Sequence, residues 1–92
     1  MKISKAIMNY AARRNMEIEV DLDDMEVRFW DARNDCEWMF SYTIENDGLN
    51  WKGNIYLPYD VKEELPAMIT SDKKLKEVID FVAKEFVSKE EW

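Results

Sequence analysis

The spacing of apolar residues near the two ends of the chain is helical. At the N-terminal end, Ser4 is suited to cap a helix over residues 4–14, whose apolar stripe comprises Ile3, Ile7, Tyr10 and Ala11. Near the C-terminal end, Ser71 or Asp72 is suited to cap a longer helix over residues 72–89. The apolar stripe of this second helix comprises Leu75, Val78, Ile79, Val82, Phe86 and Val87.

Between these helices apolar residues alternate with polar ones, which is typical of strands that bury one face. Turns are predicted at Asp23 and Asp24, at Asn34 and Asp35, and over the run from Glu45 to Gly48. These turns delimit four strands, each recognised by its apolar positions. The first strand has Met16, Ile18, Val20 and Leu22, and the second has Met25, Val27 and Phe29. The third has Trp38, Phe40, Tyr42 and Ile44, and the fourth has Trp51, Ile55 and Leu57. Residues 59–70 have no sustained period and predict a connection with at most one helical turn after Asp60.

Together these elements predict an α+β fold with two layers, in the order α-β-β-β-β-α. The sheet is a four-stranded antiparallel meander with the N-terminal and C-terminal helices on one face, and residues 1–92 form a single domain because no linker divides them. The helix stripe should pack against Ile18, Val20, Val27, Phe29, Phe40, Tyr42 and Ile55. The opposite sheet face must then meet water or a partner.

Charge makes this an acidic chain, with 20 acidic and 13 basic residues and a net charge of −7. A negative net charge repels phosphate backbones, so direct binding to nucleic acid is disfavoured. No stretch reaches the roughly 18 apolar residues that cross a bilayer, and residues 1–16 lack the apolar run of a secretory signal. The sequence therefore predicts a cytoplasmic protein without membrane contact.

The candidate chemistry of the chain is limited, because it contains no histidine and only one cysteine, Cys36. The cluster of Asp21, Asp23, Asp24 and Glu26 offers oxygen ligands, but it lacks the central glycine and terminal glutamate of a twelve-residue calcium loop. The two glycines, at positions 48 and 53, precede no helix and cannot form a phosphate loop. We therefore expect no enzyme activity, no cofactor and no metal.

An acidic run distinguishes the first predicted hairpin. Its acidic members are Glu17, Glu19, Asp21, Asp23, Asp24 and Glu26. With Asp23 and Asp24 as the turn, Asp21 lies opposite Glu26, Glu19 opposite Arg28, and Glu17 opposite Trp30. Facing carboxylates are unfavourable by up to about 1 kcal/mol, so folding alone gives little reason for them. One interpretation is a patch that faces a partner; the other is protection of an edge strand from aggregation.

A row of large side chains is predicted beside this acidic run, on the sheet face away from the helices. With Asn34 and Asp35 as a turn, Trp30 lies opposite Met39, and with Glu45 opposite Asn50, Met39 lies opposite Tyr56. Aromatic residues and methionine are enriched in protein interfaces, so this row is a candidate anchor. Alternatively Trp92, or the connection through residues 61–69, folds over the row and covers it.

The function these features favour is that of a small, acidic, noncatalytic protein-binding domain. The acidic positions would attract a basic surface of another protein, and the row of Trp30, Met39 and Tyr56 would anchor it. Basic grooves commonly hold nucleic acid, so we expect an inhibitor that occupies such a surface. In size, acidity and mixture of elements the chain resembles the small phage or mobile-element inhibitors of restriction or CRISPR nucleases, although no motif carries the resemblance.

Two alternatives belong to other classes. A structural or accessory subunit would use the sheet face to form a homodimer or a permanent complex. A double-stranded RNA-binding module is the second alternative, because Lys73, Lys74 and Lys76 resemble the lysine cluster with which that family grips phosphates. That family has three strands where four are predicted here, and the lysines equally suit a solvated helix face beside Glu77 and Asp80. Convergence of these lysines with Lys5, Arg13 and Arg14 would favour the RNA-binding alternative.

Overall fold

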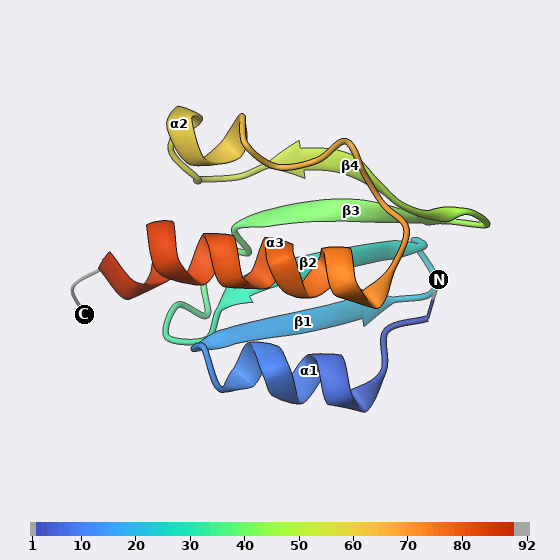
Figure 1. Cartoon of the computed structure of the whole chain (residues 1–92), viewed down its shortest axis with the longest axis horizontal. Coiled ribbons are helices and arrows are strands. Elements are labelled where there is room, and N and C mark those ends of the chain that lie inside the picture. Colours follow the sequence, from blue (N-terminus) through green and yellow to red (C-terminus); the bar gives the residue numbers. More distant parts are fainter. Residues whose placement is uncertain (1, 90–92) are drawn as a thin grey trace.

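The α+β architecture expected from the sequence is confirmed in the computed structural model, which describes residues 2–89 (Figure 1). Helices near both ends of the chain lie on one side of an antiparallel sheet whose strands follow each other in sequence order. The elements are α1 (Lys5–Ala12), β1 (Met16–Asp21), β2 (Glu26–Asp31), β3 (Phe40–Glu45), β4 (Gly48–Asn54), α2 (Tyr59–Lys62), β5 (Met68–Ile69), α3 (Asp72–Glu85) and the 3-10 turn η1 (Val87–Lys89).

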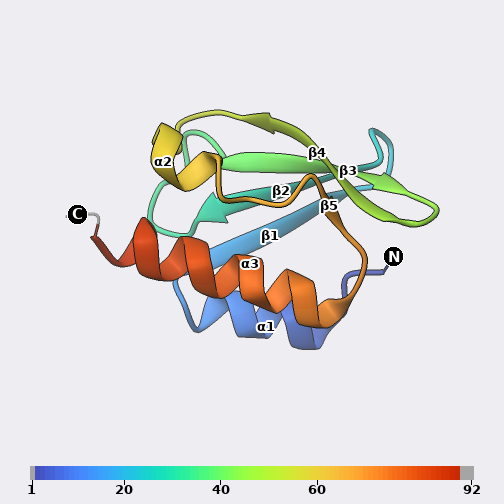
Figure 2. The same cartoon turned by 45° about the horizontal axis from the view of Figure 1, so that its top comes forward.

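The sheet has five strands in the order β1-β2-β3-β4-β5, so the prediction of four strands was one short. The additional strand, β5, pairs Ile69 with Leu49 and Met68 with Asn50, at the edge beside β4 (Figure 2). A strand of two residues is too short to show an alternating pattern, which is why the sequence predicted only a connection there. The single turn of α2 agrees with the one helical turn expected in that connection.

Both main helices begin where their capping residues predicted. The Ser4 hydroxyl accepts a hydrogen bond from the Ile7 amide at 3.2 Å, and the Ser71 hydroxyl accepts one from the Lys74 amide at 3.1 Å. Asn15 follows α1 with a φ of 61°, the left-handed conformation expected of it. The longest helix, α3, has 14 residues and is amphipathic, and none of the helices in residues 2–89 combines the length and apolar character needed to cross a membrane.

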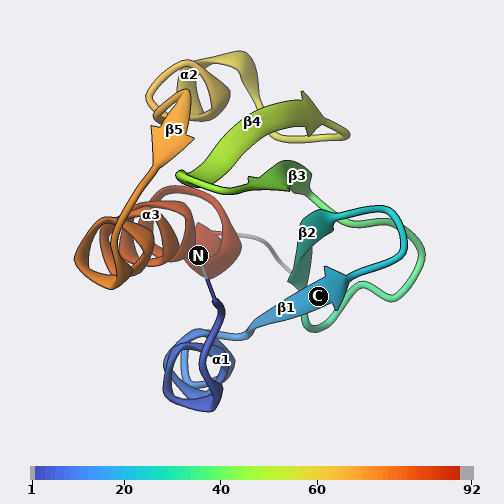
Figure 3. The same cartoon turned by 90° about the vertical axis from the view of Figure 1, so that its right-hand side faces the viewer.

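The core lies between the sheet and the helices α1 and α3, which lie side by side (Figure 3). Leu75, Val78, Ile79 and Val82 of α3 are buried there, as expected. Of their predicted partners, Ile18, Val27, Phe29, Phe40 and Tyr42 are buried and Val20 is partly buried. Ile55 is exposed, contrary to the prediction, because β4 ends at Asn54 and the chain then turns toward α2.

The register of the first hairpin is as predicted, but that of the third is not. Asp21 pairs with Glu26, Glu19 with Arg28, and Glu17 with Trp30. In the hairpin of β3 and β4, the partner of Glu45 is Gly48 rather than Asn50. The turn is therefore shorter than the sequence suggested, and a register shift between Ser41 and Tyr42 further alters the pairing along β4.

Gly48 provides a test of how closely β5 approaches the hairpin. It has a φ of 144°, and a Cβ atom placed there would lie 2.4 Å from the Ile69 carbonyl oxygen. We therefore expect Gly48→Ala to lower the free energy of unfolding by about 2–4 kcal/mol, from strain together with displaced backbone. Gly53→Ala is the matched control, because nothing lies within 4 Å of its added Cβ, and it should leave stability equal or slightly higher. Urea melts of both variants test this, and equal midpoints would refute the close packing of β5.

Candidate protein-binding face

Six side chains of the first hairpin project from the sheet face opposite the helices, which we call the outer face. They alternate with the core residues of β1 and β2 and comprise Glu17, Glu19, Asp21, Glu26, Arg28 and Trp30. Asp23 and Asp24 lie in the turn that joins the two strands. The six acidic residues predicted as a binding site therefore belong to one hairpin, four of them on its outer face and two in its turn.

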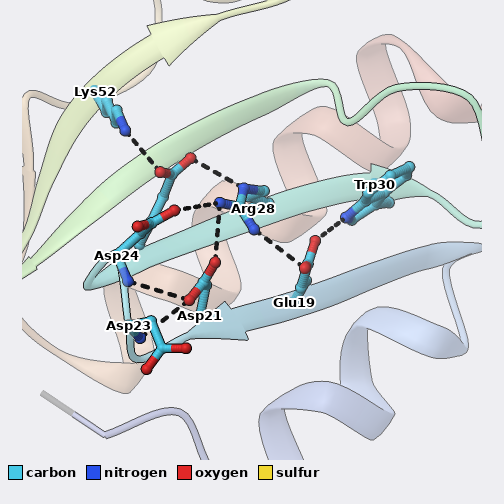
Figure 4. Close-up of polar contacts among 8 residues, drawn as sticks. Glu19, Asp21, Asp23, Asp24, Arg28, Trp30 and Lys52 are labelled. Atoms are coloured by element: carbon cyan, nitrogen blue, oxygen red, sulfur yellow. Dashed lines mark hydrogen bonds and ion pairs between the residues drawn. The ribbon is translucent and has the colours of Figure 1, made fainter.

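Arg28 lies at the centre of these carboxylates and contacts four of them (Figure 4). Its guanidinium nitrogens lie 3.1–3.4 Å from carboxylate oxygens of Glu19, Asp21, Asp24 and Glu26. Lys52 of β4 binds the second oxygen of Glu26 at 2.6 Å. The facing pair of Asp21 and Glu26 is thus bridged by a cation, so the repulsion inferred from the sequence is offset and the pair has a structural role.

The contacts within this cluster keep two of the carboxyl groups ionised. Asp21 accepts hydrogen bonds from the backbone amides of Asp24 and Asp23 and from Arg28, and these lower its pKa below the ordinary value. Burial disfavours the charged form of Glu26, but the hydrogen bond from Lys52 and the charge of Arg28 outweigh it, so its pKa is also lowered. The cluster therefore stabilises the fold at neutral pH.

Removal of the Arg28 charge should reveal how much the carboxylate cluster contributes to the free energy of unfolding, because this contribution depends on pH. Because the pKa values of Asp21 and Glu26 are lowered in the folded protein, the stabilising effect of these carboxylates is present at neutral pH and is lost as the pH falls through the lowered values. We expect Arg28→Gln to lower the free energy of unfolding by about 1–3 kcal/mol at neutral pH, and by clearly less near pH 2, because the carboxyl groups lose their charge as the pH falls through the lowered pKa values.

Lys52→Gln is the control for this experiment, because Lys52 binds only one carboxylate of the cluster and is itself exposed. Its effect should be under about 1 kcal/mol. Urea unfolding of both variants and of the unaltered protein, at neutral pH and near pH 2, provides the comparison. An Arg28→Gln effect of equal size at both pH values would contradict the electrostatic account.

The predicted row of Trp30, Met39 and Tyr56 does not form, so this part of the predicted site was wrong. Met39 is fully buried in the core, and Tyr56 packs against Phe86 with ring centroids 5.9 Å apart. The reason is that β3 begins only at Phe40, so the alternation assumed for residues 38 and 39 fails. Instead Trp38 lies beside Trp30, with ring centroids 6.0 Å apart, and the Arg28 guanidinium lies 5.2 Å from the Trp38 ring.

Trp30 itself lies on the outer face, half-buried, as predicted. Its indole Nε1 donates a hydrogen bond to Glu19 at 3.0 Å, which fixes the orientation of both side chains. Beside the indole is a pocket of about 430 Å³, which we call the Trp30 pocket. Its lining residues are Glu17, Glu19, Trp30, Asp31, Ala32, Asn34 and Asp35.

The Trp30 pocket combines an aromatic wall with carboxylates, an arrangement that suits a lysine or arginine side chain. Asp31 is buried and binds Arg33 at 3.3 Å, but Glu17 and Asp35 form no ion pair within residues 2–89. The sequence placed Asp35 in a tight turn and so missed its contribution. The polar pair of Asn34 and Asp35 was the sequence feature that could have indicated this contribution. It was interpreted as a tight turn, whereas it belongs to a longer loop between the end of β2 and Phe40.

Two segments were expected as alternatives to cover the row of Trp30, Met39 and Tyr56: Trp92 and the connection through residues 61–69. Trp92 lies outside the described residues. Within the connection, Val61 and Ile69 are buried in the core and Leu65 packs against it. These residues therefore complete the core at the β4 and β5 edge, whereas Trp30 lies on β2.

The basic residues of the RNA-binding alternative are interrupted by acidic ones. The Arg14 guanidinium binds Asp80 at 2.7 Å, and the Tyr10 hydroxyl donates to the same carboxylate. Lys76 lies 5.3 Å from the Tyr10 ring, so Asp80 is close to both cations. A carboxylate within the cluster weakens its attraction for phosphate. Among the described residues no group of three acidic or cysteine side chains has the arrangement of a metal site.

Comparison with protein-family models, with curated proteins and with solved structures gives no match for this chain. The site is therefore interpreted from its own geometry and charge.

Proposed function

We propose that this protein is a noncatalytic protein-binding domain whose acidic outer face occupies a basic, nucleic-acid-binding surface of a partner protein. The observation that carries the proposal is the charge of the first hairpin, which has six carboxylates. Four of them contact the cations Arg28 and Lys52, and the other two, Glu17 and Asp23, form no ion pair within residues 2–89. This excess of negative charge lies on a sheet face that the helices leave uncovered (Figure 3). An inhibitor of restriction or CRISPR nucleases from a phage or mobile element is the particular kind of protein we favour.

The strand geometry gives these charges a regular spacing. Alternate residues of a strand repeat at about 6.8 Å, so Glu17, Glu19 and Asp21 form an evenly spaced line of carboxylates along β1. A strand of nucleic acid carries a phosphate every 3.4 Å or so of helix axis, roughly twice this density. The line can therefore face a groove whose cations are spaced for phosphates, contacting a subset of them.

Preorganisation supports the same interpretation. Glu19 is held by Arg28 and by the Trp30 indole, so part of its side-chain entropy is already lost before a partner binds. Glu17, Asp23 and Asp35 form no ion pair within residues 2–89 and are exposed, so their charges are available to a partner. We infer that a lysine or arginine of the partner enters the Trp30 pocket between Glu17 and Asp35.

A homodimer through the outer face is less consistent with the structure. Two copies that met face to face would bring their acidic hairpins together, and like charges across an interface oppose association. The acidic outer face therefore favours a basic protein as its partner, rather than a second copy of this chain.

The proposal is tested by capturing proteins from the lysate of the native host on the immobilised domain and identifying what is retained. The variant Glu17→Lys, Asp23→Lys and Asp35→Lys reverses three exposed charges without removing a contact of Arg28. Reversal of Asp21 or Glu26 is unsuitable, since Asp21 holds the turn and Glu26 is buried. The matched control reverses three exposed charges near α2: Asp60→Lys, Glu63→Lys and Glu64→Lys.

The expected result is a nucleic-acid-binding protein retained by the unaltered domain and by the α2 control, and lost from the outer-face variant. Retention should also weaken as salt rises, because exposed charges attract each other through the solvent. Equal retention by both charge-reversed variants would refute the outer face as the binding site. A retained protein without a nucleic-acid-binding surface would leave the binding site standing and refute the inhibitor function.

A further inference from the structure

The lining of the Trp30 pocket contains four carboxylates and no basic side chain. Two of these carboxylates, Glu19 and Asp31, already bind a guanidinium group of this chain, at 3.1 and 3.3 Å. The other two, Glu17 and Asp35, are exposed and form no ion pair within residues 2–89. The pocket therefore offers two carboxylates to a cation from outside the described part of the chain.

Strand pairing places one of these two carboxylates beside the indole. Glu17 is the cross-strand partner of Trp30, and the Cβ atoms of such a pair lie about 5 Å apart on the same face. The hydrogen bond from the indole to Glu19 fixes the ring (Figure 4). Trp38 packs against the ring but does not line the pocket, so it contacts another part of the indole. A cation in the pocket would thus meet a fixed aromatic ring together with Glu17 and Asp35.

At two places within residues 2–89 an aromatic ring and a carboxylate together hold a cation of this chain, and both cations are arginines. The Arg14 guanidinium lies 3.5 Å from the centre of the Tyr10 ring and binds Asp80 at 2.7 Å. The Arg28 guanidinium lies 5.2 Å from the centre of the Trp38 ring and also binds carboxylates on the outer face. The Trp30 pocket has the same ring and carboxylates, without the guanidinium of either arginine.

A guanidinium group suits this combination better than an ammonium group. It is planar, so it can stack on the indole while the N–H groups in its plane reach carboxylates at the rim of the pocket. It is also more weakly hydrated, so it loses less when it leaves water. An ammonium group acts as a compact point charge that retains its water, as Lys52 does when it binds Glu26 and stays exposed.

We propose that the Trp30 pocket is an arginine site, which takes a guanidinium group between the indole and the carboxylates of Glu17 and Asp35 in preference to the ammonium group of a lysine. The proposal rests on the proposed function only for the source of this group, which is an arginine side chain of the partner protein. A surface that binds nucleic acid supplies it, because arginine is the preferred side chain for recognising phosphate. Free arginine is a poorer fit, since the lining has no cation to bind its α-carboxylate.

Nuclear magnetic resonance titrations of the isotope-labelled protein with small probes test this preference without the partner. N-acetyl-arginine amide and N-acetyl-lysine amide carry the same charge, so they differ only in the cationic group and its stem. We expect the signals of the Trp30 indole N–H and of the Ala32 and Asp35 amides to shift saturably with the arginine amide. The affinity should be at least about fivefold higher than for the lysine amide. Free arginine should bind no more tightly than its amide.

Neutral variants of similar shape test the two carboxylates. Glu17→Gln and Asp35→Asn should each weaken binding of the arginine amide at least about threefold. Asp23→Asn is the matched control, because Asp23 is exposed and loses the same charge but does not line the pocket, so its effect should be under about twofold. Similar losses in all three variants would show attraction by net charge alone and overturn the site.

The remaining outcomes separate this inference from the proposed function. Absence of saturable shifts with the arginine amide, or equal affinity for both amides, would overturn the arginine site even where the capture experiment retains a nucleic-acid-binding protein. Tighter binding of free arginine than of its amide would overturn the protein as the source of the guanidinium. A clear preference for the arginine amide would support the site even where the captured protein has no nucleic-acid-binding surface, an outcome that refutes the inhibitor function alone.

Discussion

The substitution Val82→Asp is expected to unfold the protein. Val82 is fully buried on α3, in the core that this helix forms with the sheet. A carboxylate there would have no partner, and an unpaired buried charge lowers stability by about 4 kcal/mol or more. A domain of this size is stable by only about 5–14 kcal/mol, so the variant should show no cooperative melt in circular dichroism, or one at a much lower temperature.

Lys84→Asp is the control for this substitution, because it introduces the same side chain on the exposed side of α3. It lies in the last turn, where a negative charge is unfavourable for the helix dipole by about 0.3–1 kcal/mol, so the variant should stay folded. A Val82→Asp variant that melts like the control would show that the buried face of α3 is misassigned.

The substitution Trp30→Ala should have the largest effect on binding of any single change on the outer face. The indole forms one wall of the Trp30 pocket and orients Glu19 through its hydrogen bond. Truncation of such an anchor commonly weakens binding by about 2 kcal/mol, which is roughly thirtyfold in affinity. The fold loses little, because Trp30 is only half-buried, so the melting temperature should fall by less than about 8 °C.

Titration calorimetry measures how tightly the Trp30→Ala variant binds the partner protein that was retained in the capture experiment. The variant Tyr59→Ala is the control. Tyr59 is an exposed aromatic residue on α2, so its removal should change neither affinity nor stability appreciably. Unchanged affinity for Trp30→Ala, or a collapse in its stability, would place the anchor elsewhere.

The sequence predicted those parts of the structure in which local chemistry and burial agree. Ser4 and Ser71 marked both helix starts, because a hydroxyl is one of the few groups that satisfies a free amide there. The register of the first hairpin followed from the alternation of its residues and from the two aspartates of its turn. Consequently Trp30 and the acidic residues of β1 were assigned to the correct face.

Contacts between distant segments were not predictable in the same way. β5 exists because Ile69 pairs with Leu49, a contact that leaves no local pattern in the sequence. Met39 enters the core because the loop before β3 is longer than a tight turn, so the alternation that would have exposed it begins one residue later. The role of Arg28 was also missed: pairing placed it opposite Glu19, but only the structure brings Asp21, Asp24 and Glu26 to the same guanidinium.

The measurement that tests the proposed function most directly is competition between this protein and nucleic acid for the protein retained in the capture experiment. A fluorescently labelled duplex bound to that protein is titrated with the unaltered domain, and its anisotropy is followed. We expect full release of the duplex by the unaltered domain and by the α2 control, and little release by the variant with lysine at positions 17, 23 and 35. A ternary complex, in which the duplex stays bound while the domain binds as well, would contradict the proposed occupation of a nucleic-acid-binding surface.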